Sequence, residues 1–276
     1  CNVYPILEGR LVAADKEQKY TTQFQAGLGM VSECIEILKL HEIGMRSIEL
    51  EAKVLKAGVF SGCTARRVHN LVSEMFAPRF YRPDSGTADR IKTMIDMSVS
   101  TDVLRQVFLI QTARAQLALH DFITELYWPL QKRGTDFINL TTAKDFLTAA
   151  AQNGKLKKPW SAITLGRVAG YLLGACHDFS LVEKGQNGQR AFKHFRLLKP
   201  AALYLAHDLR FSGLGDTAIV SHRDWALFGL DQPELVLELL YELSADGHFL
   251  IQSGAGLVQF SWKHPSWKEA IHGIAG

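Results

Sequence analysis

Cysteine is scarce in this chain of 276 residues: there are four, Cys1, Cys34, Cys63 and Cys176, and no two lie close together. That spacing argues against a structural zinc site and gives no disulfide framework. Long apolar runs are missing as well, because the most apolar run, Leu165–Cys176, is too short to span a bilayer and contains Arg167. No secretion signal is recognisable. We therefore expect a cytoplasmic protein with reduced, mostly buried thiols.

Catalytic signatures are also lacking. The chain has no glycine-rich phosphate loop followed by lysine and a hydroxyl residue, and no nucleophile elbow. Metal-dependent phosphohydrolases use His-Asp pairs, and three occur here, at His120-Asp121, His177-Asp178 and His207-Asp208, but no further ligands at metal spacing accompany them. We expect no enzyme, no catalytic residue, no metal site, no cofactor and no small-molecule substrate.

Positive charge, by contrast, is concentrated in one segment. The whole chain has a net charge of +3, whereas Lys155–Lys199 holds nine basic residues against two acidic ones, a net charge of +7. From Ala201 to Gly276, four basic residues face nine acidic ones, a net charge of −5. A concentrated cationic surface suits nucleic acid, since each neutralised phosphate releases counterions. The alternative interpretation is a solvated, lysine-rich loop.

The order of elements in this basic segment is that of a winged helix. A first helix is expected over Thr141–Ala151, with Thr141 as N-cap and Gly154 after its end, and a second over Ser161–His177, with Ser161 as N-cap. Two strands, Phe179–Lys184 and Arg190–Leu198, flank Gly185–Gln189, whose Asn187-Gly188 pair suits a tight turn. The pattern predicts a central basic winged helix over residues 141–199.

The residues expected to contact DNA are basic or polar and lie mainly in this module. Thr164, Arg167 and Tyr171 share one exposed stripe of the second helix, and a single arginine there predicts little sequence preference. Lys184 and Arg190 lie nearest the turn and should contribute most. The full set is Lys155, Lys157, Lys158, Ser161, Thr164, Arg167, Tyr171, Lys184, Asn187, Gln189, Arg190, Lys193 and Arg196, with Arg66 and Arg67 outside the module.

The N-terminal half is expected to be helical. After a lead-in over residues 1–20, a helical domain is predicted over residues 21–128, beginning near Thr21 or Thr22 on the stripe Phe24, Leu28, Val31, Ile35 and Leu38. Pro78 and Pro83 should interrupt the helix that carries the paired arginines, and Pro129–Leu140 is the candidate domain linker. The other expected helices are Ser47–Ala57, Ser61–Phe76, Asp89–Met97, Thr101–Ala113 and Ala115–Tyr127.

The C-terminal part, residues 216–272, repeats the winged-helix pattern with acidic chemistry. Helices are expected over His222–Leu230 and Pro233–Ala245, the second packing through Leu235, Leu239 and Leu243. Strands are expected over His248–Ser253 and Leu257–Trp262. No lysine or arginine lies between Asp224 and Trp262, while Glu234, Glu238 and Glu242 should repel phosphate. We expect this module to cap the core or bind a protein, and a chain ending near Gly215 to keep most of its DNA affinity if it folds.

A family resemblance extends over residues 20–272. It is carried by Phe24-Gln-Ala-Gly-Leu-Gly29, the Ser61–Met75 helix, His120–Glu125, Thr141–Phe146, the Thr164–Leu173 helix followed by Phe179-Ser-Leu-Val182, and Ala226–Leu230 before a glycine-centred hairpin. In this order the chain resembles the BrxA family of the bacteriophage exclusion (BREX) systems. The resemblance implies helices similar to the antitermination factor NusB, winged-helix modules, double-stranded DNA binding and no known enzymatic activity. The chain departs from the family by its longer lead-in and by the nine-residue connection Gln152–Trp160, where a compact helix-turn-helix has about three or four residues.

The expected fold class is therefore mainly α with small β-hairpins: a NusB-like helical domain followed by two winged-helix modules. The favoured function is a non-enzymatic subunit that binds double-stranded DNA and contacts other BREX proteins through the C-terminal module. One alternative is a protein adaptor without DNA contact. Another is RNA binding, which only the NusB analogy suggests. Salt-dependent retention on duplex DNA would separate these interpretations.

Overall fold

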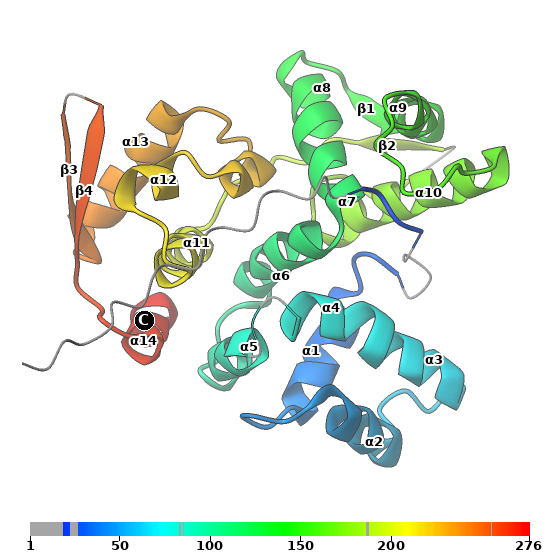
Figure 1. Cartoon of the computed structure of the whole chain (residues 1–276), viewed down its shortest axis with the longest axis horizontal. Coiled ribbons are helices and arrows are strands. Elements are labelled where there is room, and N and C mark those ends of the chain that lie inside the picture. Colours follow the sequence, from blue (N-terminus) through cyan, green and yellow to red (C-terminus); the bar gives the residue numbers. More distant parts are fainter. Residues whose placement is uncertain (1–18, 23–26, 83, 85, 186–187, 255) are drawn as a thin grey trace, which may run out of the picture.

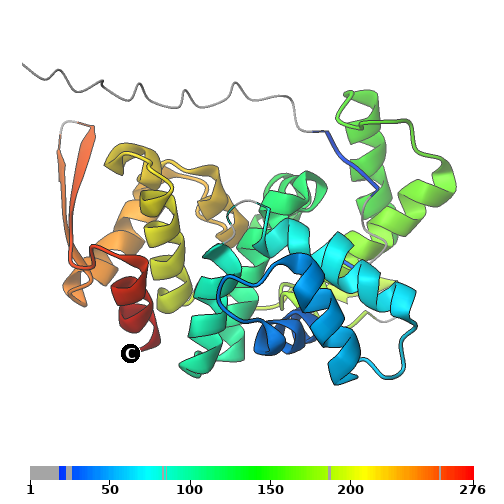
Figure 2. The same ribbon diagram turned by 60° about the horizontal axis from the view of Figure 1, so that its bottom comes forward.

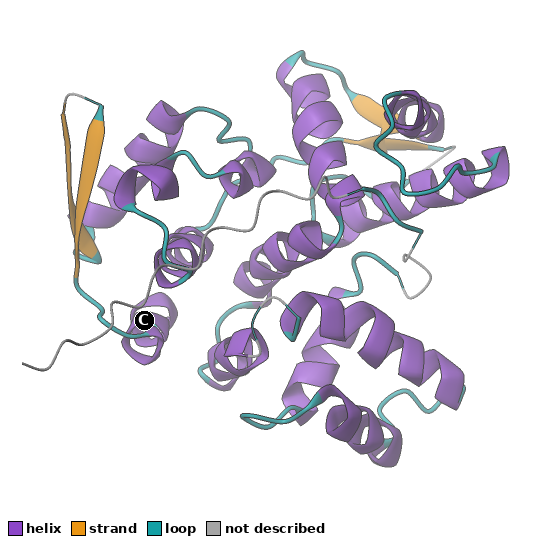
Figure 3. Cartoon of the chain, in the orientation of Figure 1, coloured by secondary structure: helices purple, strands orange, loops and turns teal. Residues whose placement is uncertain are grey.

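The chain folds into helices and two small antiparallel strand pairs (Figures 1 and 3). The structure, a computed structural model, describes residues 19–22, 27–82, 84, 86–185, 188–254 and 256–276. In chain order the elements are α1 Val31–Leu40, α2 Ser47–Ala57, α3 Ala65–His69, η1 Asn70–Phe76, α4 Ala77–Phe80, α5 Gly86–Asp96, α6 Thr101–Ala115, α7 Leu117–Asp121, η2 Phe122–Tyr127, α8 Trp128–Lys132, β1 Phe137–Asn139, α9 Leu140–Gln152, α10 Ala162–Asp178, β2 Gln189–Ala191, α11 Lys199–Phe211, α12 Asp216–Val220, η3 Arg223–Phe228, α13 Pro233–Ala245, β3 Phe249–Gly254, β4 Leu257–Trp262 and α14 Trp267–Ala275. The prediction of a mainly helical chain with small strand pairs is confirmed.

The first helix begins about three turns later than the sequence pattern indicated. Gly27 has a φ of 105° and Met30 a φ of 51°, so the backbone just before Val31 is in the left-handed region and cannot be part of a regular α-helix. Leu28 is buried from this irregular segment, whereas Phe24 lies outside the described residues. The predicted start near Thr21 or Thr22 is therefore wrong, although α2 ends before Gly58 as predicted, with a φ of 64° there.

Two prolines that the sequence interpretation treated as breaks lie inside continuous helical segments. Pro78 lies just after η1 and Pro129 just after η2, and both η1 and η2 are π-helices. At their ends the Ala77 N–H donates to the Val72 carbonyl and the Trp128 N–H donates to the Ile123 carbonyl, each five residues earlier. A proline ring clashes with the carbonyl four residues earlier in an α-helix, and we attribute its tolerance here to the wider π turn. Pro78 therefore does not interrupt its helix; Pro83 lies outside the described residues.

The predicted linker Pro129–Leu140 contains structure. It holds most of α8, the strand β1 and the first residue of α9. β1 pairs antiparallel with β2, with Ile138 opposite Arg190, and Val182 forms a further antiparallel bridge with Phe192. Asn139 at the end of β1 caps α9 by accepting a hydrogen bond from the Thr142 N–H, so the cap is Asn139 rather than Thr141.

The two central strands are shorter than predicted. Ser180 is left-handed, with a φ of 61°, and the Leu181 N–H donates to the Cys176 carbonyl at 2.8 Å, so the end of α10 extends into the predicted first strand. Only Val182 of that strand then forms a bridge, which pairs it with Phe192. After Phe192 the chain leaves the strand and lies along α6, where the Gln106 side chain donates to the Arg196 carbonyl at 2.8 Å and accepts from the Leu198 N–H at 2.9 Å. The predicted strands Phe179–Lys184 and Arg190–Leu198 are therefore wrong in length.

Helices α6 and α11 form the centre of the molecule (Figures 1 and 2). Every residue of α11 from Ala201 to Leu209 is buried, and α14 and α6 pack against it. A helix that is buried on all sides has no polar face and hence no amphipathic period. For that reason the sequence pattern missed α11, and it also missed the short α12 and the final α14.

The C-terminal part contains the predicted hairpin. β3 and β4 pair antiparallel, with Phe249 opposite Trp262 and Ile251 opposite Phe260. The buried face of α13 consists of Val236, Leu240 and Leu243, so the predicted face is wrong by one residue at its first two positions; Leu235 is 37% exposed. The predicted helix over His222–Leu230 is a shorter 3-10 helix, η3.

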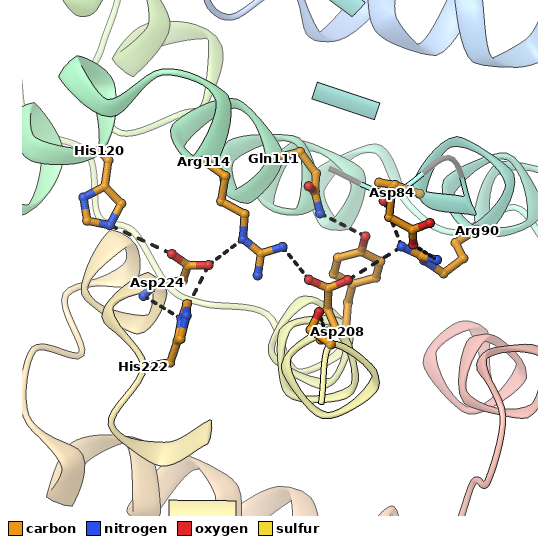
Figure 4. A network of polar contacts seen from close by, with 11 residues as sticks. Asp84, Arg90, Gln111, Arg114, His120, Asp208, His222 and Asp224 are labelled. Carbon is orange, nitrogen blue, oxygen red and sulfur yellow. Dashed lines mark hydrogen bonds and ion pairs between the residues drawn. The ribbon is translucent and has the colours of Figure 1, made fainter. Parts of the chain in front are cut away.

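A chain of polar groups around the buried carboxylates of Asp208 and Asp224 joins the C-terminal part to the central helices, as Figure 4 shows. The Arg114 guanidinium on α6 donates to Asp224 at 2.6 Å and also contacts Asp208 on α11. Asp208 continues the chain to Arg90 on α5 at 3.9 Å, and Arg90 pairs with Asp84 at 2.6 Å. Burial alone would lower the pKa of Arg114, but the two carboxylates raise it above its usual value.

Apolar and backbone contacts reinforce the same junction. The Trp128 indole N–H donates to the Leu227 carbonyl at 3.0 Å, and a Cβ on Gly229 would lie 3.2 Å from the Trp128 ring. Trp267 on α14 contacts the Tyr204 ring, and the Arg90 guanidinium lies 4.6 Å from the Trp267 ring centroid. The C-terminal part is thus built into the core rather than attached to its surface.

Candidate nucleic-acid interface

Helix α10 presents one polar and one apolar side, and its start is fixed by the predicted cap. The Ser161 hydroxyl accepts a hydrogen bond from the Thr164 N–H at 3.2 Å, which confirms Ser161 as N-cap. On the predicted polar stripe, Arg167 is exposed, whereas Thr164 and Tyr171 are half-buried. The opposite side packs into the core through Val168, Ala169, Leu172, Leu173, Ala175 and Cys176.

Six of the predicted basic residues are exposed and carry no ion pair with another described residue: Arg66, Lys157, Lys158, Arg167, Lys184 and Arg196. Lys157 and Lys158 lie in the α9–α10 loop, Arg167 lies on α10, and Lys184 follows the Val182 bridge. Figure 1 shows the N-terminal end of α10 and the start of β2 on the same side of the molecule, away from the C-terminal part. Arg190 on β2 is half-buried and Gln189 is exposed; Asn187 lies outside the described residues.

Other predicted basic residues have acidic partners. Lys193 lies 3.7 Å from Glu183, and Lys199 donates to Asp246 at 2.7 Å. Arg196 is exposed and lines a shallow pocket of about 250 Å³ together with Arg105 and Lys193, at the far end of the strands from the turn.

Arg66 and Arg67 lie at the start of α3. Arg66 is exposed and Arg67 is half-buried. Figure 1 draws α3 at the lower right, well apart from α9 and α10. The fold therefore does not bring these two arginines together with the basic residues of the central module.

Lys155 is paired with two carboxylates and is therefore not a free surface cation. Its ammonium group donates to Asp121 at 3.0 Å and to Glu125 at 2.8 Å, and it lies 6.0 Å from the Tyr20 ring centroid. The Tyr20 hydroxyl donates to Asp121 at 2.7 Å. Because two carboxylates already neutralise this lysine, it adds little to any phosphate-binding surface.

The Asp121 carboxylate predicts a pH dependence of stability. Burial alone would raise its pKa, but the His120 ring 3.4 Å away and hydrogen bonds from Tyr20 and Lys155 lower it to about 2. A carboxyl with a depressed folded pKa stabilises the fold above its unfolded pKa, and the contribution is lost as pH falls through the folded value. We expect stability to fall between about pH 4 and pH 2, and Asp121→Asn to remove part of that slope in urea melts recorded at several pH values. An unchanged slope in the variant would contradict the assignment.

Within the described ranges, no group of three or more His, Cys, Asp or Glu side chains could hold a metal ion. The thiols of Cys34 and Cys176 are buried, which raises their pKa to about 11 and about 12, whereas Cys63 is exposed. Among the described residues, no helix has both the length and the apolar character that crossing a membrane requires.

The three His-Asp pairs do not form one site. Asp121 is bonded to Tyr20 and Lys155, Asp208 to Arg114, and the Asp178 carboxylate accepts from the Met30 N–H at 3.2 Å. Each aspartate therefore holds two distant parts of the chain together.

Sequence reasoning missed three residues that border the candidate interface. Thr21, Thr22 and Trp160 line a pocket together with Lys157 and Lys158. The lead-in had been separated from the winged helix, and its neighbours in space are about 135 residues away in the chain. The available signal was weak: a tyrosine followed by two hydroxyl residues before a helical region.

Comparison with protein families gives one match. The model of the family described as BrxA matches residues 18–207, which is more than two thirds of the chain and ends within α11. No curated protein matches the chain, and no solved structure matches it.

Proposed function

The chain belongs to the BrxA family, and we propose that it is a non-enzymatic subunit that binds double-stranded DNA with low sequence preference. Family membership itself indicates a BREX-associated role. The DNA-binding role rests on one observation above the others: four exposed lysine and arginine side chains without described ionic partners come from a loop, a helix and a strand region of one small module.

The connectivity of this module supports its interpretation as a winged helix. β1 leads into α9, a loop and α10, after which Val182 and β2 return to complete a small antiparallel sheet with β1. This order matches helix-turn-helix proteins with an added hairpin, in which the second helix enters the major groove. On this interpretation α10 is the recognition helix and the segment around Gly188, which has a φ of 77°, is the wing.

Electrostatics suit a phosphate contact more than base readout. Arg167 is the single arginine on α10, and Gly170 beside it offers no side chain, so the exposed side of this helix has few groups that could form bidentate bonds with base edges. Lysines on flanking loops reach the backbone instead, and backbone contacts carry no direct sequence information.

We expect the triple variant Arg167→Gln, Lys184→Gln, Arg190→Gln to bind duplex DNA more weakly for all sequences alike. Each lost phosphate contact lowers the slope of log affinity against log salt by about 0.9, so three contacts would lower it by about 2.7. Fluorescence anisotropy at several salt concentrations measures both affinity and slope.

A matched control separates a local contact from the loss of net charge. Lys56 on α2, Lys263 after β4 and Lys268 on α14 are exposed and lie outside the central module. Lys56→Gln, Lys263→Gln and Lys268→Gln together therefore remove three positive charges elsewhere, as many as the triple variant removes. The control should change the slope by much less than the triple variant. Equal slopes in the two folded variants would remove α10 and the wing from the binding mechanism.

The low sequence preference is a separate prediction. A selection from random duplexes should enrich no defined motif of several base pairs, because one arginine on α10 provides at most one bidentate base contact. Enrichment of such a motif would show that the interface reads bases through groups other than those proposed.

A protein adaptor without DNA contact is the second candidate, and the C-terminal part favours it as an additional role. Glu234, Glu238 and Glu242 are exposed on α13, and Leu250 and Leu257 on the hairpin are 67% and 71% exposed. Such a surface repels phosphate but suits another BREX protein. Failure of the full chain to bind duplex DNA at low salt would leave the adaptor as the better explanation, and a preference for RNA over duplex DNA would favour the NusB-like alternative.

A further inference from the structure

A pocket of about 420 Å³ opens beside the N-terminal end of α10. It lies between the lead-in segment and the α9–α10 loop, two parts of the chain that are far apart in sequence. Its lining residues are Tyr20, Thr21, Thr22, Lys157, Lys158, Pro159, Trp160 and Thr164.

The lead-in segment is held firmly against the loop. The Tyr20 N–H donates to the Lys155 carbonyl at 2.8 Å, and the Lys157 N–H donates to the Tyr20 carbonyl at 3.0 Å, which makes a parallel bridge between the two segments. Tyr20 is 1% exposed, and its hydroxyl is bonded to Asp121. This anchor fixes the positions of Thr21, which is half-buried, and Thr22, which is exposed.

The lining groups are donors of the kind that anionic oxygens accept. Lys157 and Lys158 are exposed ammonium groups, Thr21 and Thr22 add hydroxyls, and none of the described residues that line the pocket carries a carboxylate. The start of the 17-residue helix α10 lies next to the pocket. The Thr164 N–H there is bonded to the Ser161 hydroxyl, whereas the N–H groups of Ala162 and Ile163 have no intrahelical acceptor. Pro159 and Trp160 supply an apolar wall on the remaining side.

We propose that this pocket binds one phosphodiester of the DNA backbone, with its deoxyribose against Pro159 and Trp160. The inference rests on the proposed DNA-binding function and extends it, because it makes Thr21 and Thr22, which directly follow the lead-in, part of the interface. The long α9–α10 loop then has a role: paired with the lead-in, it forms a second phosphate contact beside α10. An acidic peptide would share the ammonium contacts but would not need the hydroxyls, the apolar wall and the adjoining helix terminus together.

The test compares two pocket variants in the full chain by duplex DNA anisotropy titrations. Thr21→Val with Thr22→Val removes two neutral donors at nearly constant shape, so we expect roughly tenfold weaker binding and an unchanged salt slope. Lys157→Gln with Lys158→Gln removes charge, so we expect the slope to fall by about 0.9 for each lysine that contacts phosphate. Lys56→Gln with Lys268→Gln is the control for net charge.

The outcomes distinguish this pocket from the proposed function as a whole. If the wild-type chain binds duplex DNA and both pocket variants bind like the control, the pocket is overturned and the DNA-binding function stands. If the wild-type chain does not bind duplex DNA, the function fails and the pocket assignment fails with it. Thermal melts check folding, and the single variant Thr22→Val, at the exposed position, replaces the double variant if the latter is destabilised.

A ligand-side measurement makes the same distinction independently. A duplex in which a fraction of the phosphates is replaced by neutral methylphosphonates should bind the wild type more weakly. The affinity ratio between the native and the modified duplex should be smaller for the lysine pocket variant, because that variant makes fewer phosphate contacts. Inorganic phosphate and a 5′-phosphorylated dinucleotide serve as competitors. Competition by the dinucleotide but not by equal inorganic phosphate supports a site for phosphate with its sugar, and equal competition by both contradicts the role of the apolar wall.

Discussion

Asp224→Ala is expected to lower the free energy of unfolding by about 3 to 5 kcal/mol, because the variant removes a buried carboxylate and leaves the partly buried Arg114 guanidinium with one of its two partners. Asp224 is 1% exposed, accepts from Arg114 at 2.6 Å and lies 3.6 Å from His222. Removing one member of a buried ion pair costs more than the pair contributes, since the remaining charge keeps its desolvation penalty.

Urea unfolding followed by circular dichroism measures this loss. The matched control is Asp231→Ala, since Asp231 is exposed and pairs with Lys132 at 2.8 Å on the surface. A surface pair is worth about 1 kcal/mol or less. Asp224→Asn keeps the shape of the side chain and isolates the effect of charge. Similar losses for Asp224→Ala and Asp231→Ala would show that the buried network does not stabilise the junction.

Local signals predicted those parts of the fold whose causes are local. The Ser161 cap, the glycine after α2 and the hairpin β3–β4 depend on residues within a few positions of one another, and each is found where the sequence placed it. Helix α11 was missed because its burial on all sides removes the polar face that marks a helix in sequence. β1 was missed because its three residues acquire their role only from pairing with β2 about fifty positions later.

In the candidate interface, too, the role of a residue depends on partners that are far away in the sequence. Lys155 and Lys157 are two residues apart, and nothing near them in the sequence distinguishes their roles. Lys155 is neutralised by Asp121 and Glu125, about thirty positions earlier, whereas Lys157 is exposed beside the pocket. Charge density along the sequence therefore locates the basic module but does not say which of its cations are available for DNA.

A chain truncated after Gly215 is expected to lose its cooperative fold, so the condition under which it would keep most of its DNA affinity, namely that it folds, should not be met. Truncation removes α14, which packs against both α11 and α5, and so exposes apolar groups that are now covered, among them the rings of Tyr204 and Phe211 that contact Trp267. It also removes Asp224 from Arg114 and the Leu227 carbonyl from the Trp128 indole.

The size of these effects decides the outcome. The buried ion pair alone is worth about 3 to 5 kcal/mol when one partner is lost, and domains are stable by only about 5 to 15 kcal/mol in total. Exposure of the buried Tyr204 ring adds about 2 to 3 kcal/mol, and exposure of the half-buried Phe211 ring adds about 1 kcal/mol. The summed loss reaches the whole stability of a typical domain, so far-ultraviolet circular dichroism should show a broad, weakly cooperative urea transition for the truncated chain.

The role of the acidic surface must therefore be tested in the full chain. Glu234→Gln, Glu238→Gln and Glu242→Gln together remove three exposed charges from α13 without touching its buried face. If this surface only repels DNA, the variant should bind duplex slightly more tightly, mainly at low salt where screening is weak. If it also binds another BREX protein, phage defence should fall while duplex affinity does not. A truncated chain that unfolds in one sharp transition and binds duplex DNA as the full chain does would instead show that the C-terminal part is dispensable.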